Sequence, residues 1–239
     1  MNTTQHTTKQ ALITIALTLV CIVPATAATY YVDASSGYDG NDGLAPESAW
    51  QSLNRITWIA LEAGDTVLLK RGDVWHEPLI MHSSGAAGAP ITYGAYGSGA
   101  APVIDGAVPV TGWTPVAATI FTAPLAALPE MVLVDGARGT FEWSASDLNA
   151  AGEWTWADGV LAVYSETTPA NVEAVAWQGL VAGYYVQYVT VQDLTLLHGS
   201  VAAFVYNSNH ITLSNLTVHD NAGMAAVLIA SDTPGLGEH

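Results

Sequence analysis

The stretch VTVQDLTL, residues 189–196, is matched 22 residues later by ITLSNLTV, residues 211–218. Each stretch alternates β-branched and polar residues and is interrupted by Asp, Asn or Ser, a pattern typical of short strands and turns rather than a helix. A unit of this length cannot bury its own apolar face, so copies of it must stack on one another. The repeat therefore decides the fold class.

This repeat predicts a parallel β-solenoid whose coils lie roughly 4.8 Å apart. In this register Val191 stacks on Leu213 inside, and Asp193 meets Asn215 at a turn. The same offset aligns three further pairs: Leu196 with Val218, Ala203 with Ala225, and Val205 with Val227. A β-sandwich with two similar strands is the alternative.

The segment 1–27 has the features of a secretory signal peptide. Lys9 precedes an apolar run over residues 11–23, and Ala25-Thr26-Ala27 fits a small-x-small cleavage site. Removal of this segment leaves one predicted domain, residues 28–239. We therefore expect a protein that is secreted, periplasmic or held at the cell surface.

The mature chain is strongly acidic. It keeps four of the five Lys and Arg and all 21 Asp and Glu, which gives a net charge of −17. Such a charge excludes binding to nucleic acid or an anionic membrane by electrostatics. No later segment is apolar enough for membrane insertion.

The region 28–64 is expected to hold a strand, a loop and a cap helix. Asp39, Asn41 and Asp42 place three oxygen-bearing side chains in that loop, a set that suits Ca²⁺, although an ordinary Asx-turn loop also explains them. Leu53 and Ile56 then begin an apolar face over residues 50–61, which predicts a helical cap on the first coil.

Residues 65–110 predict the first coil, from strands at 66–70, 79–81 and 91–93. Residues 111–180 lose the period of the repeat and predict a β-rich side insertion with a hairpin turn at Asp158-Gly159. Trp143, in a polar run, is the candidate substrate-binding aromatic, because aromatic faces stack on sugar rings. The alternative is that tryptophans hold the insertion to the coils.

Residues 181–239 predict the regular coils. Beyond Ser231 there is no amphipathic helix that would cap the last coil. We expect the chain to be truncated, with further coils missing; docking of the open end on another subunit is the alternative. The oligomeric state is left open.

Several short motifs carry a family resemblance. YYVD at 30–33, AGDTV at 63–67, KRGD at 70–73 and PITYGAYG at 90–97 resemble the N-terminal part of bacterial right-handed parallel β-helix proteins of the pectate-lyase-like superfamily. This resemblance implies an all-β, right-handed parallel β-helix and a secreted, carbohydrate-active protein acting on an extracellular polysaccharide, as lyase or glycoside hydrolase. A non-catalytic glycan-binding or cell-surface β-helix, or an inactive fragment of a longer enzyme, is the alternative.

The resemblance implies that a lyase of this superfamily would use a Lys or Arg as its base, commonly together with Ca²⁺. The mature chain offers only Arg55, Lys70, Arg71 and Arg138, all outside the regular repeats, which disfavours a lyase site here.

A hydrolase needs two carboxylates. The register of the repeat places Asp220 beside His198, with His219 adjacent. We therefore take Asp220 as the candidate general acid or base, with His198 as its tuning neighbour or as a hydrogen-bond donor to substrate. A solvated turn is the alternative.

Overall fold

The structure is a computed structural model that describes residues 26–175, 179–223 and 225–232. The predicted signal peptide lies outside these residues apart from its last two positions. Strands make up nearly all the regular structure of the described part, which confirms the all-β prediction. No helix within the described ranges is long and apolar enough to cross a membrane.

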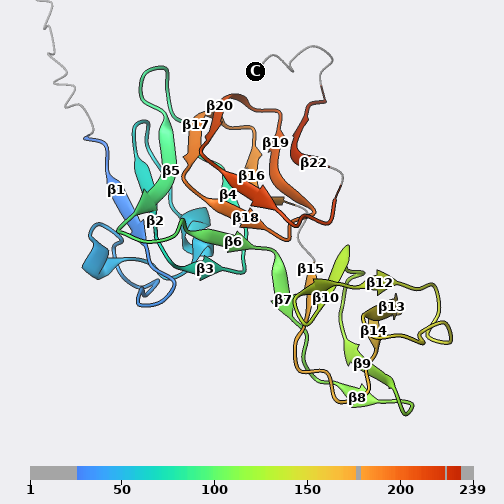
Figure 1. Cartoon of the computed structure of the whole chain (residues 1–239). Coiled ribbons are helices and arrows are strands. Elements are labelled where there is room, and N and C mark those ends of the chain that lie inside the picture. The colour runs from blue at the N-terminus through green and yellow to red at the C-terminus, as the bar shows by residue number, and fades with distance from the viewer. Residues whose placement is uncertain (1–25, 176–178, 224, 233–239) are drawn as a thin grey trace, which may run out of the picture.

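Three sheets in the described part contain only parallel pairs (Figure 1). The first has the order β1 (Thr29–Val32), β2 (Thr66–Lys70), β5 (Ile91–Tyr96), β17 (Gln187–Gln192), β20 (Asn209–Ser214). The second runs β3 (Val74–Trp75), β6 (Val103–Asp105), β18 (Thr195–Leu197), β21 (Thr217–His219). The third runs β4 (Leu79–Met81), β16 (Gly179–Tyr184), β19 (Val201–Tyr206), β22 (Ala225–Ala230). One pass of the chain through all three sheets is called a coil below.

The predicted register holds in two of the sheets. Val191 pairs with Leu213 and Leu196 with Val218, each at the offset of the sequence repeat. In the third sheet the prediction was wrong, because Ala203 pairs with Val227 rather than with Ala225. The loop between β21 and β22 has two more residues than the loop between β18 and β19. A shift of two residues keeps every side chain on its expected face.

The division into coils also differs from the prediction. Residues 91–93, expected to complete the first coil, belong to β5, which pairs with β2 and opens the next coil. The short strand β3 supplies the missing second-sheet strand. Its two residues are too few to give a clear alternation in the sequence.

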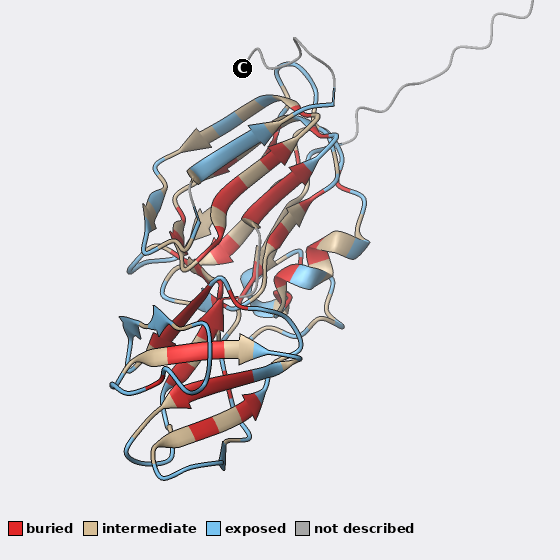
Figure 2. Ribbon diagram, turned by 90° about the vertical axis from the view of Figure 1, so that its right-hand side faces the viewer, coloured by how far each residue is buried: buried red, intermediate tan, exposed pale blue. Residues whose placement is uncertain are grey.

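The core lies between the three parallel sheets. Val189, Val191 and Leu196 are fully buried in it, and the buried residues of successive strands form rows along the stack (Figure 2). The outermost strand, β22, is different, since Val227, Leu228 and Ile229 are 44, 41 and 47% exposed.

The N-terminal cap is not the amphipathic α-helix expected over residues 50–61. The described segment forms 3₁₀-helices at Pro46–Ser48 (η1) and Leu53–Trp58 (η2). Leu53 and Ile56 are three residues apart, a spacing that aligns side chains in a helix of three residues per turn. Both are buried, and η2 packs against β4, the edge strand of the third sheet.

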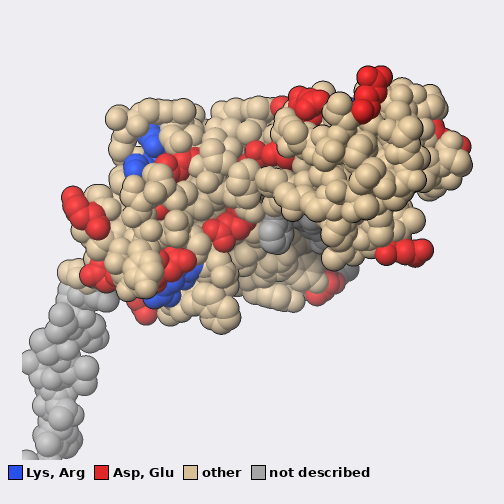
Figure 3. Space-filling model, turned by 90° about the horizontal axis from the view of Figure 1, so that it is seen from below, with Lys and Arg blue, Asp and Glu red and all other residues tan. Residues whose placement is uncertain are grey.

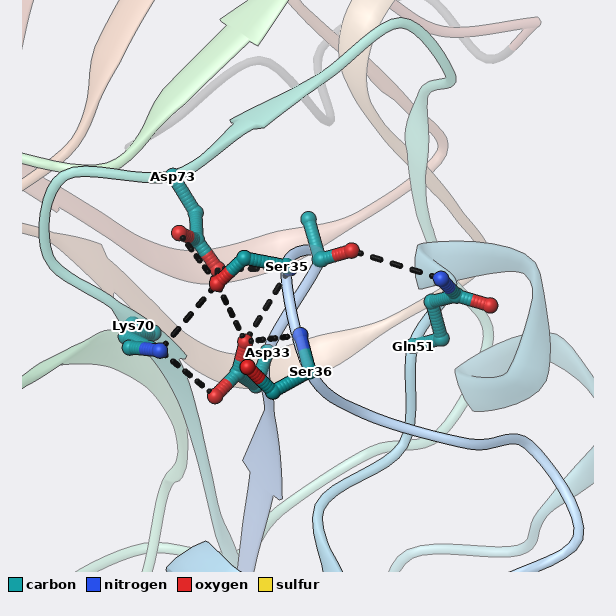
Figure 4. A network of polar contacts seen from close by, with 7 residues as sticks. Asp33, Ser35, Ser36, Gln51, Lys70 and Asp73 are labelled. Carbon is teal, nitrogen blue, oxygen red and sulfur yellow. Dashed lines mark hydrogen bonds and ion pairs between the residues drawn. The ribbon is translucent and has the colours of Figure 1, made fainter.

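A polar network fastens the N-terminal segment to the stack (Figure 4). Lys70 Nζ lies 2.7 Å from Asp33 Oδ2 and also donates to Ser35 Oγ, which bonds Asp73. Burial alone would raise the pKa of Asp33, but hydrogen bonds from Lys70, Ser35 and Ser36 together lower it. The carboxylate is therefore held ionised.

The insertion, residues 107–175, interrupts one coil between β6 and β16. Its first sheet has the order β11 (Ala137–Arg138), β10 (Met131–Val134), β15 (Val172–Val175), β7 (Ala107–Pro109). Its second has the order β12 (Thr140–Phe141), β13 (Glu153–Ala157), β14 (Val160–Tyr164), β9 (Ile120–Pro124), β8 (Thr114–Pro115). Most pairs are antiparallel, and only β12 and β13 pair in parallel. The first and last strands, β7 and β15, pair with each other, so the chain enters and leaves the insertion at one place.

The predicted hairpin turn at Asp158-Gly159 is confirmed. Both residues have positive φ, 50° and 82°, as a two-residue turn of the hairpin type requires. Trp154 belongs to the insertion's own core cluster, and Trp113 and Trp156 pack against that cluster, whereas Trp177 lies outside the described residues. The tryptophans therefore pack mainly within the insertion.

Candidate functional site

The corners of the coils are built on a repeated backbone conformation. Asp193 and Asn215 have φ of 61° and 49°, and His198 and Asp220 have φ of 53° and 58°. Left-handed conformations cost least for glycine and for short polar residues, which explains the Asp and Asn at these corners. Asn215 also donates a hydrogen bond to Asp193, which confirms the predicted turn contact. This stacking fixes His198 and Asp220 on neighbouring coils.

His198 is held by a residue from the preceding coil. Its Nδ1 lies 2.7 Å from Asp105 Oδ1, and both side chains are largely buried. The backbone amide of Ala107 donates to the same Asp105 oxygen. A proton on Nδ1 leaves Nε2 as the ring nitrogen that meets a ligand or water.

Asp220 is paired with its predicted neighbour His219. The Nδ1 of His219 lies 2.7 Å from Asp220 Oδ2. This hydrogen bond, with a smaller contribution from the charges of His219 and His198, lowers the pKa of Asp220. Asp220 is therefore suited to be a base or a nucleophile rather than a proton donor.

A pocket of about 140 Å³ brings part of this group together with the insertion. His198 and Asp220 line one side, and Met131, Leu133 and Arg138 line the other. Arg138 Nη2 also donates a long hydrogen bond of 3.5 Å to the carbonyl of Ala222, in the loop after Asp220. The insertion thus places a cation in the pocket that the two coil residues line. We call this the corner pocket.

The spacing of the two carboxylates follows from the strand order. Asp105 is the last residue of β6, and Asp220 directly follows β21, with β18 between these strands. Two strand spacings separate their backbones by roughly 10 Å.

The predicted Ca²⁺ ligands make separate contacts. Asp39 accepts hydrogen bonds from the backbone amides of Gln51 and Ser52, and Asp42 accepts one from the Ser48 hydroxyl. Asn41 Nδ2 donates to the carbonyl of Ala49. These contacts are those of Asx-turn loops, and no group of three or more His, Cys, Asp or Glu in the described part is arranged to hold a metal. Calcium binding stays a prediction.

Trp143, the predicted substrate-binding residue, is 89% exposed on the insertion. It packs edge-on against Phe141, with ring centroids 5.1 Å apart. It does not line the corner pocket, so the structure does not bring Trp143 together with His198 and Asp220.

The charged groups are unevenly spread. On the face drawn in Figure 3, Lys and Arg lie toward the N-terminal end of the described chain, whereas Asp and Glu are scattered over the whole face, including that end. Arg138 is the one Lys or Arg within the described insertion. A lone cation in an acidic protein is the natural contact for a carboxylate or a developing negative charge.

Sequence reasoning missed two residues of this site. Asp105 ends the second-sheet strand of an earlier coil, and the offset of the repeat does not reach it because the insertion separates it from His198 by 93 positions. Arg138 was set aside because it lies outside the repeats. Only the folding of the insertion back onto the coils brings it to Asp220.

Comparison with known proteins gives one local match in sequence and several in structure. The chain is 41% identical over 73 residues to a lacto-N-biosidase from Bifidobacterium longum subsp. longum, a stretch covering 29% of this chain and 5% of that protein. No family model matches the chain.

Solved structures share the fold. The GH136 lacto-N-biosidase from Eubacterium ramulus aligns with a TM-score of 0.53 at 22% identity, covering 86% of this chain and 31% of that one. XylC in complex with xylose aligns with a TM-score of 0.62 at 16% identity, covering 83% and 41%. A chain described as a glycoside hydrolase aligns with a TM-score of 0.53 at 13% identity, covering 72% and 51%. This chain thus spans about half or less of each of these proteins.

Proposed function

We propose that this chain is an extracellular carbohydrate-active protein that hydrolyses glycosidic bonds at the corner pocket, on a right-handed parallel β-helix of the pectate-lyase-like kind. The three parallel sheets support this fold, because chain crossovers between parallel strands of one sheet are right-handed in almost all proteins. The extracellular location is supported by the signal-peptide features of the segment 1–27.

One observation carries the proposed activity. The corner pocket gathers an ionised carboxylate, Asp220, and an imidazole, His198, that is held by a second carboxylate, Asp105. The local identity with a lacto-N-biosidase supports a sugar as substrate.

In the proposed reaction, Asp220 takes a proton from a water that attacks the anomeric carbon. His198, protonated on both ring nitrogens and held at Nδ1 by Asp105, gives its Nε2 proton to the glycosidic oxygen as that bond breaks. Arg138 stabilises negative charge or orients a polar group of the sugar. Because water attacks directly and no covalent intermediate forms, the proposed reaction inverts the anomeric carbon.

The test is a substrate screen with the purified chain. Neutral polysaccharides, lacto-N-biose-containing oligosaccharides and uronate polymers are incubated with it, and new reducing ends are measured together with the ultraviolet absorbance of unsaturated uronates. We expect reducing ends without absorbance, and a loss of about 100-fold or more in Asp220→Asn.

Asp158→Asn is the matched control. Asp158 has a φ of 50°, close to that of Asp220, but lies at a hairpin turn of the insertion. Absorbance from a uronate polymer would instead indicate a lyase and point to Arg138 as its base. Equal activity in both variants would contradict the proposed role of Asp220.

A second candidate, glycan binding without catalysis, is favoured by the exposure of Trp143 beside Phe141. Retention on a polysaccharide with no product from any substrate would support it over hydrolysis.

A further inference from the structure

Two more pockets, one on the insertion and one on the coils beside it, share one lining residue. The larger, about 350 Å³, is lined by Glu130 with Phe141, Trp143 and Trp154 of the insertion. The other, about 260 Å³, is lined by Glu130 with Tyr184 and Phe204, which belong to β16 and β19. Neither shares a residue with the corner pocket. Glu130 therefore joins a surface of the insertion to the outer face of the third sheet.

Aromatic rings line both sides of this junction. Phe141 contacts Trp143 at 5.1 Å and the buried Trp154 at 4.9 Å between ring centroids. Beyond Glu130, the rings of Tyr184 and Phe204 lie 5.7 Å apart. Flat apolar rings of this kind cover the C–H faces of sugars, and each loses little side-chain freedom on binding.

The surfaces that carry these rings are held in place. The amide of Glu130 donates to the carbonyl of Val175 in β15, and Trp154 is 4% exposed within the insertion core. Tyr184 and Phe204 project from paired strands of neighbouring coils. A ligand would meet rings that are already positioned, which lowers the entropy cost of binding.

The polar groups of the junction indicate which ligand fits. The Glu130 side chain is exposed and lines both pockets, so its carboxylate can accept hydrogen bonds from ligand hydroxyls. Among the described residues that line the two pockets there is no Lys or Arg, and the whole chain carries a charge of −16. Both features oppose a polyanion.

We propose that the two pockets form one groove, centred on Glu130, that binds a neutral glycan chain apart from the corner pocket. The choice of a glycan rests on the proposed function, and the choice of a neutral one rests on the charges. Rings on either side of Glu130 would stack on different sugar units of one chain, and the carboxylate would accept hydroxyl protons between them.

The test measures binding separately from turnover. In the full chain carrying Asp220→Asn, affinity electrophoresis in gels containing a neutral or a uronate polysaccharide gives the affinity for each. We expect retardation by a neutral polymer and none by polygalacturonate. Trp143→Ala and Phe204→Ala should each weaken binding about tenfold, the effect of truncating a central aromatic anchor.

Trp58→Ala is the matched control. Trp58 is 77% exposed but lies on η2, against β4 rather than at the groove. Thermal unfolding of each variant separates lost binding from lost structure. Binding unchanged in both groove variants, or weakened equally in Trp58→Ala, would overturn the groove.

Ligand length tests whether the pockets act as one site. A long neutral oligosaccharide should lose affinity in both groove variants, whereas a disaccharide, which occupies one pocket, should be affected by only one of them. Equal sensitivity of both ligands to both variants would refute a single groove. If the chain with Asp220 intact binds the glycan but does not hydrolyse it, the groove is supported and the proposed activity is refuted. If it hydrolyses the glycan but the groove variants bind as well as the parent, the activity is supported and the groove is refuted.

Discussion

His198 Nδ1 lies 2.7 Å from Asp105 Oδ1 although 93 residues separate the two in the chain. The contact spans neighbouring strands of the second sheet, since Asp105 pairs with Leu197, the residue before His198. A hydrogen bond of this kind fixes both the ring orientation and the position of its proton.

Asp105→Asn should keep the fold and lower turnover. The amide offers the imidazole a neutral partner and no longer stabilises its protonated form, so we expect a fall in kcat of about 100-fold, within the range for one acid–base group. Steady-state kinetics on the best substrate of the screen is the measurement. A rise in KM with unchanged kcat would assign Asp105 to binding instead.

His219→Ala should move the acid limb of the pH–rate profile to higher pH. The His219 hydrogen bond lowers the pKa of Asp220, so its loss returns that pKa toward the usual value of about 3.9. Protonated Asp220 cannot act as base, and activity then falls at a higher pH than in the parent. His210→Asn, at a left-handed residue near the start of β20, is the control. Identical profiles in both variants would argue against Asp220 as the base.

Lys70→Met should weaken the chain's stability, with a dependence on pH. Because the pKa of Asp33 is lowered in the folded state, its ionisation stabilises the fold above the unfolded pKa of about 3.9. That contribution is lost as the pH falls through the lowered folded value. Urea unfolding at neutral and acid pH should show a difference between variant and parent that shrinks at acid pH. A constant difference would point to lost packing of the Lys70 stem.

Asn215→Val should be more destabilising than Asn215→Gly. Asn215 has a φ of 49°, which glycine adopts freely and a β-branched residue adopts only with strain. Both variants lose the hydrogen bond to Asp193, so their difference isolates the backbone cost, about 1–3 kcal/mol. Denaturant titration of the two proteins measures it. Equal stabilities would mean that the corner relaxes out of the left-handed conformation.

The repeat made the stacked part of the fold predictable. Val191 over Leu213 and Leu196 over Val218 follow from matched apolar positions, and both pairs are as predicted. The predicted register failed where a loop between two strands differs in length from the matching loop of the previous coil. Two additional residues before Ala225 change the offset of β22 without changing the alternation that sequence reasoning reads.

Only part of the candidate site could be predicted from the sequence. His198 and Asp220 were found together because they occupy one corner of successive coils. The insertion separates Asp105 from His198 in sequence, and Arg138 lies within the insertion, so the 22-residue repeat predicts neither residue's contacts. Trp143 was chosen because it lies in a polar run, and it is 89% exposed, while its role in binding rests on the groove proposed above.

Because β7 and β15 pair with each other, the insertion is a segment that could be replaced as a unit. Its two ends leave the stack side by side, so its length and sequence can change without altering the stacking register of the coils that precede or follow it. Replacement of this segment alone would change what the insertion recognises, while the corner residues His198 and Asp220 keep their places on the repeating geometry of the coils.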